Sequence, residues 1–140
     1  LATASRERLE GEELKRLVIG IRRLGSNEEA IRLVDDFMGR SPESRIRSSL
    51  LDIRARAKMD LAKKCMDTAR SPKTSAQLRR KAWDRCRRYL DEAESDLFAA
   101  LSSVVAPPDR EYMEKSLDFL KSMKELARRP EGSIGRRNRK

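Results

Sequence analysis

The stretch WDRCRRYLDEAESDLFAALSSV, residues 83–104, has the clearest helical pattern in the chain. Its apolar residues are spaced alternately by three and four positions: Trp83, Cys86, Leu90, Ala93, Leu97, Ala100 and Val104. This spacing places them on one stripe of an α-helix, in the heptad arrangement of packed helices. The stretch therefore predicts a helix that packs against another helix in the core.

Apolar residues with the same period predict further helices on both sides of this stretch. They fall within residues 5–24, 26–39, 41–69 and 109–130, and no segment alternates as a strand does. Gly25 and Gly39 are typical helix ends, Ser26 with Glu29 has the spacing of a capping box, and Asp109 is the expected cap of the last helix.

The short loops between these helices favour antiparallel neighbours. We therefore expect an all-α protein, an up-down antiparallel four-helix bundle with an additional short helix in the N-terminal half. Residues 1–130 form one domain in this prediction, and residues 131–140 form a disordered basic tail.

The net charge of the 140-residue chain is +10, from 33 Lys and Arg against 23 Asp and Glu, and it is unevenly distributed. Ten of the cations lie within residues 63–88, beside only Asp67 and Asp84: Lys63, Lys64, Arg70, Lys73, Arg79, Arg80, Lys81, Arg85, Arg87 and Arg88. Several follow a predicted helix start, where the macrodipole favours acids, so helix stability does not explain them. We expect these cations, with Arg136 and Arg137 of the tail, to bind a partner. The alternative is a solvated face neutralised by counterions.

The composition argues against an enzyme. The chain has no His, which excludes His-containing triads and zinc sites, and no Gly-rich loop lies between a strand and a helix. We expect no catalytic residues, no cofactor and no metal site. The acidic residues Asp91, Glu92, Glu94 and Asp96 are interpreted as a solvated face rather than as metal ligands.

Cys65, Cys86 and Trp83 lie on apolar stripes and each has alternative roles. Buried free thiols are expected for the two cysteines, with a disulfide, a redox role or a metal role as the alternatives. Trp83 is expected to anchor the core; its alternative is a contribution to a partner pocket or stacking on a nucleic-acid base.

A family resemblance covers residues 43–130. It is carried by Lys81-Ala82-Trp83, Asp96-Leu97-Phe98, Pro107-Pro108, Lys115-Ser116-Leu117 and Leu126-Ala127. In these motifs the chain resembles the PsbQ-like proteins, which implies a four-helix bundle of the chloroplast thylakoid lumen. The resemblance implies a non-catalytic extrinsic subunit in photosynthesis, docked on photosystem II or on the chloroplast NADH dehydrogenase-like complex. About 40 residues precede the matching region, and no helix corresponding to the family's last one follows Pro130.

Two functions follow from the distribution of charge. The first is electrostatic docking on an acidic protein surface of a multi-subunit complex. The alternative is binding of nucleic acid, RNA in particular, through the basic hairpin and tail, although Trp83 is the only aromatic residue within residues 63–88 and 131–140. Binding to an anionic membrane surface ranks last, and no apolar run approaches the roughly 18–20 residues of a membrane span.

Overall fold

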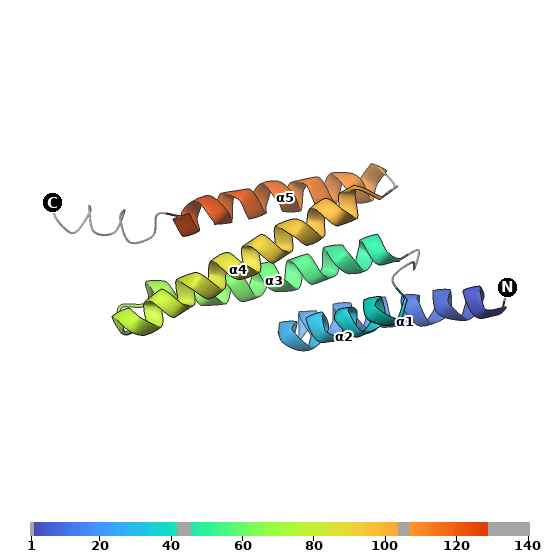
Figure 1. Ribbon diagram of the computed structural model, residues 1–140, viewed down its shortest axis with the longest axis horizontal. Coiled ribbons are helices and arrows are strands. Elements are labelled where there is room, and N and C mark those ends of the chain that lie inside the picture. Colours follow the sequence, from blue (N-terminus) through green and yellow to red (C-terminus); the bar gives the residue numbers. More distant parts are fainter. Residues whose placement is uncertain (1, 42–45, 104–106, 129–140) are drawn as a thin grey trace.

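The computed structural model describes residues 2–41, 46–103 and 107–128. These ranges form five α-helices and contain no strand (Figure 1). The helices are α1 (Ala2–Arg23), α2 (Asn27–Arg40), α3 (Arg47–Arg70), α4 (Ala76–Leu101) and α5 (Pro107–Arg128). The all-α prediction is confirmed. The predicted tail, residues 131–140, lies outside the described residues.

The helix ends follow local backbone chemistry, but several differ from the sequence prediction. Gly39 does not end its helix, because α2 continues through it to Arg40. Gly25 has a φ of 87° between α1 and α2, a left-handed conformation that favours glycine. The side chain of Ser26 makes no capping hydrogen bond, so the predicted capping box does not form, and Glu29 accepts a hydrogen bond from Arg32 instead. Helix α5 begins at Pro107, because proline suits the first turn, and Asp109 lies inside that turn rather than at the cap.

Helix α3 is the central element of the fold. It packs most extensively against α4, and it also contacts α1, α2 and α5. Figure 1 shows the α1–α2 pair on one side of α3 and α4 with α5 on the other, with successive helices running in opposite directions. The up-down four-helix bundle expected from the sequence stays a prediction.

Two main groups of buried apolar side chains hold the helices together. One lies among α3, α4 and α5, and it contains the predicted stripe residues Trp83, Cys86, Leu90, Ala93 and Leu97. Trp83 is only 2% exposed, which confirms its role as a core anchor. The other joins α1 and α2 to the first half of α3 through Val18, Ala30, Val34, Phe37, Ile46, Leu50 and Ile53.

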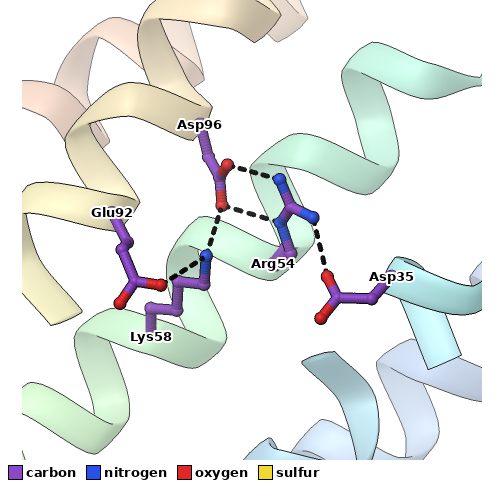
Figure 2. Close-up of polar contacts among 5 residues, drawn as sticks. All are labelled: Asp35, Arg54, Lys58, Glu92 and Asp96. Carbon is purple, nitrogen blue, oxygen red and sulfur yellow. Dashed lines mark hydrogen bonds and ion pairs between the residues drawn. The ribbon is translucent and has the colours of Figure 1, made fainter. Parts of the chain in front are cut away.

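A cluster of charged side chains links α2, α3 and α4 (Figure 2). Arg54 donates two hydrogen bonds to the carboxylate of Asp96, from Nε at 2.9 Å and from Nη2 at 2.6 Å. Its Nη1 donates to Asp35 at 2.7 Å. The Lys58 ammonium lies 3.4 Å from Asp96 and 3.6 Å from Glu92. The hydrogen bonds that Arg54 donates to Asp96 raise the pKa of Arg54 above its ordinary value, so this guanidinium stays charged.

The cluster corrects the interpretation of the acidic residues of α4. Asp91 and Glu92 are exposed, but Asp96 is only 5% exposed, so it does not belong to a solvated face. Asp91 and Glu94 contact Lys124 of α5 at 3.0 and 2.9 Å. The acids therefore join helices, and their partners lie far along the chain, where the local pattern of α4 cannot show them.

Replacement of Asp96 by Asn tests this cluster. Asn leaves the half-buried Arg54 and the buried Lys58 without their shared carboxylate, with only the exposed Asp35 and Glu92 as partners, so the free energy of unfolding should fall by about 3 kcal/mol in urea titrations. The control is Glu111→Gln, which removes only an exposed pair with Lys115 and should change stability by less than about 0.5 kcal/mol. Equal losses in the two variants would contradict a special role for the cluster.

A basic groove at the tip of α3 and α4

Ten predicted binding residues lie in the last two turns of α3, in the turn that follows and in the first half of α4. We call this the basic tip: Lys63, Lys64, Arg70, Lys73, Arg79, Arg80, Lys81, Arg85, Arg87 and Arg88. All ten are exposed except Arg79, which is half-buried. In Figure 1 the α3–α4 pair extends past the α1–α2 pair at this end. Arg136 and Arg137, the two other predicted residues, lie outside the described residues.

The turn between α3 and α4 is held by hydrogen bonds within the basic tip. The hydroxyl of Ser75 accepts from the N–H of Leu78 at 3.3 Å, which caps the first turn of α4. Arg79 Nη2 donates to the carbonyls of Ser71 at 3.4 Å and Thr74 at 3.2 Å. Arg79 therefore stabilises the turn that carries its neighbours.

Arg87 also has a structural role. Its Nε donates to the carbonyl of Ala127 at 3.1 Å, which satisfies one of the free carbonyls at the end of α5. Its guanidinium lies 6.0 Å from the ring centroid of Trp83, and Nη1 contacts Asp84 at 3.4 Å. A reversal of charge at Arg79 or Arg87 would therefore disturb the fold as well as any binding surface.

Four other cations of the basic tip surround a groove of about 620 Å³ between α3 and α4. We call this the basic groove, and Lys64, Lys81, Arg85 and Arg88 contribute to its lining. Within the described ranges, none of these four side chains forms an ion pair. Glu28 and Asp84 are the acids of the lining, so cations predominate there.

The floor of the basic groove is largely apolar, and the helical period of the sequence does not predict it. Leu61, Cys65, Leu78 and Tyr89 line it, and Leu78 is 57% exposed. Leu61 and Cys65 lie seven and eleven positions after Arg54, so they continue the side of α3 that carries the charged cluster. Leu78 is the one hint of this floor in the sequence, because it is apolar and yet does not lie on the buried stripe through Trp83.

The position at which α2 begins explains why the groove is open. Asp35 of α2 contacts Arg54 beside the α3–α4 seam, and Glu28, two turns earlier, lies at the edge of the groove. Helix α2 begins at Asn27, so it covers the seam no further. The groove is therefore the part of the α3–α4 seam that lies beyond α2.

The two thiols occupy different environments. Cys86 is buried in the core, as predicted, whereas Cys65 is half-buried in the groove wall. Both are free, so the alternative of a disulfide is not realised in the structure. Burial raises the pKa of Cys65 and raises the pKa of Cys86 to about 11, so both thiols stay protonated near neutral pH.

In the part of the chain that the structure describes, no three or more His, Cys, Asp or Glu side chains lie together so that they could hold a metal ion. Among the same residues, no helix combines the length and the hydropathy that crossing a membrane requires.

Comparisons of this chain with protein-family models, with curated proteins and with solved structures found no match. The PsbQ-like resemblance therefore stays a prediction from the motifs.

Alkylation by iodoacetamide at about pH 8 should distinguish the two cysteines. Cys65 should react slowly, because its raised pKa keeps the thiolate scarce, and faster as the pH rises; Cys86 should stay unmodified while the protein is folded. Peptide mapping by mass spectrometry gives the two rates, with urea-unfolded protein as the control in which both react. Equal rates in the folded protein would contradict this placement of the thiols.

Proposed function

We propose that the protein is a non-catalytic subunit of a larger assembly, and that it docks through the basic groove onto an acidic helical segment of a partner protein. The observation that carries this proposal is the set of four unpaired cations around an apolar floor. Unpaired cations speed encounter with an acidic partner, and the apolar floor gives the complex stability and register.

Helix α2 illustrates how an acidic helix packs beside the α3–α4 seam. It places Val34 and Phe37 in the core while Asp35 contacts Arg54 at 2.7 Å. A partner helix that continues along the seam would place apolar residues on Leu61 and Leu78. Its carboxylates would then face Lys64, Lys81 and Arg88, as Asp35 faces Arg54.

The lining of the groove favours a protein partner over RNA. Leu61 and Leu78 offer apolar contact area, whereas RNA binding uses phosphate contacts together with exposed aromatic or Arg faces for stacking. Tyr89, the aromatic residue of the lining, is half-buried. Nucleic-acid binding is therefore the alternative function, and a test must distinguish it from binding of a protein helix.

The proposal also includes the finer expectations from the sequence. The up-down four-helix bundle is the proposed architecture of the domain that carries the basic groove, with α3 and α4 as two of its helices. The PsbQ-like resemblance names one assembly of the proposed kind, an extrinsic complex in the thylakoid lumen.

Fluorescence anisotropy with a labelled model helix tests the proposal. The probe is a synthetic amphipathic peptide of Leu, Ala and Glu with Leu at helical spacing; a peptide of the same composition in scrambled order and a single-stranded RNA are the comparisons. The amphipathic peptide should bind about tenfold more tightly than the scrambled one, because only it has a continuous apolar face. Raising NaCl from about 50 to 500 mM should weaken its binding.

A pair of charge variants localises the binding. The triple variant Lys64→Glu, Lys81→Glu and Arg88→Glu reverses the groove and should lose peptide binding. The control Arg16→Glu, Lys121→Glu and Arg128→Glu has the same net charge on other exposed positions and should keep it. Equal losses in both variants, or equal affinity for the scrambled peptide, would contradict the groove as the site. Tighter binding of the RNA would favour the nucleic-acid alternative.

A further inference from the structure

A second pocket, of about 320 Å³, lies on a different side of α3, between α1, α3 and α5. Its α3 residues include Met59 and Lys63, whereas Leu61 and Cys65 line the basic groove. These two sets lie on different faces of one helix. Lys63, which the sequence grouped with the basic tip, therefore belongs to this pocket rather than to the groove.

The lining of the pocket combines positive charge with apolar walls. Four cationic side chains contribute to it, Arg22, Arg56, Lys63 and Lys115, with Asp60 as the single carboxylate of the lining. Met59, Met123 and Phe119 form apolar walls, and Phe119 is 61% exposed. This combination is typical of a site for an anion with an apolar body.

Both arginines of the pocket have a hydrogen-bond donor without an acceptor. Arg22 contacts Asp60 through Nη2 at 3.2 Å, but its buried Nε has no hydrogen-bond partner among the residues that the structure describes. Arg56 donates from Nε to Asp52 at 3.2 Å and from Nη1 to the Tyr112 hydroxyl, and its guanidinium lies 3.6 Å above the Tyr112 ring. Its buried Nη2 has no hydrogen-bond partner within the described part of the chain.

Such unpaired donors are unusual, because buried polar groups nearly always find a partner. Both guanidinium groups belong to the lining of the pocket, so an anion bound there lies beside them. A carboxylate there would accept from Arg22 and Arg56 together, and charge-assisted hydrogen bonds of this kind are strong.

We propose that this pocket binds a small amphipathic carboxylate, with its head between Arg22 and Arg56 and its apolar chain against Met59, Phe119 and Met123. The site is independent of docking at the basic groove, since the two share no lining residue.

Methyl NMR of protein labelled at the methionine methyl groups tests the site. Octanoate is the probe; octanol keeps the apolar chain without the charge, and acetate keeps the charge without the chain. Octanoate should give saturable shifts at Met59 and Met123 and smaller ones at Met66, which does not line the pocket. Octanol and acetate should each bind at least about tenfold more weakly.

Two variants of α5 make the test specific. Phe119→Glu places a carboxylate in the apolar wall and should abolish octanoate binding. Leu126→Glu makes the same kind of change at a position that is also exposed, two turns further along and outside the pocket, and it should bind octanoate as the wild type does. Because both positions are exposed, both variants should keep the wild-type unfolding midpoint. Equal affinity for octanol and octanoate, or unchanged binding by Phe119→Glu, would overturn the proposal.

Discussion

The two hydrogen bonds between Arg54 and Asp96 fix how α3 faces α4. Asp96 is only 5% exposed, and a buried carboxylate must keep its cations, so a rotation of either helix would leave charges unpaired. Asp35 brings α2 into the same cluster through Arg54. Apolar side chains can still pack when one helix shifts slightly along the other, whereas the two hydrogen bonds between Arg54 and Asp96 form in one geometry.

This constraint reaches the basic groove along the helix faces. On α3 the stripe that begins with Arg54 and Lys58 continues through Leu61 and Cys65, and on α4 the stripe that begins with Asp96 continues back to Tyr89. The charged cluster therefore sets which side chains form the floor of the groove. The two arginines with structural roles, Arg79 and Arg87, hold the turn and the end of α5, whereas the neighbouring cations are exposed.

The sequence predicts those parts of the structure that depend on local period and on capping. The stripe from Trp83 to Ala100 is buried as predicted, because one period of apolar residues determines one buried face. The basic tip was predictable from charge density alone. The role of Asp96 and the apolar floor of the groove were not, since both depend on which face of α3 meets α4, and the local period of either helix does not determine that pairing.

Two groups of charges act in opposite ways in this protein: the cluster around the buried Asp96 holds helices together, and the exposed cations of the basic tip repel one another. The free energy of unfolding in urea, measured from about 50 to 500 mM NaCl, tests this division most directly. Salt screens exposed charges over about 10 Å at 0.1 M but hardly affects buried pairs. Stability should therefore rise with salt, as repulsion at the tip is screened while the Arg54–Asp96 contact persists. A steady fall in stability with salt would contradict the account, because exposed ion pairs would then be holding the fold.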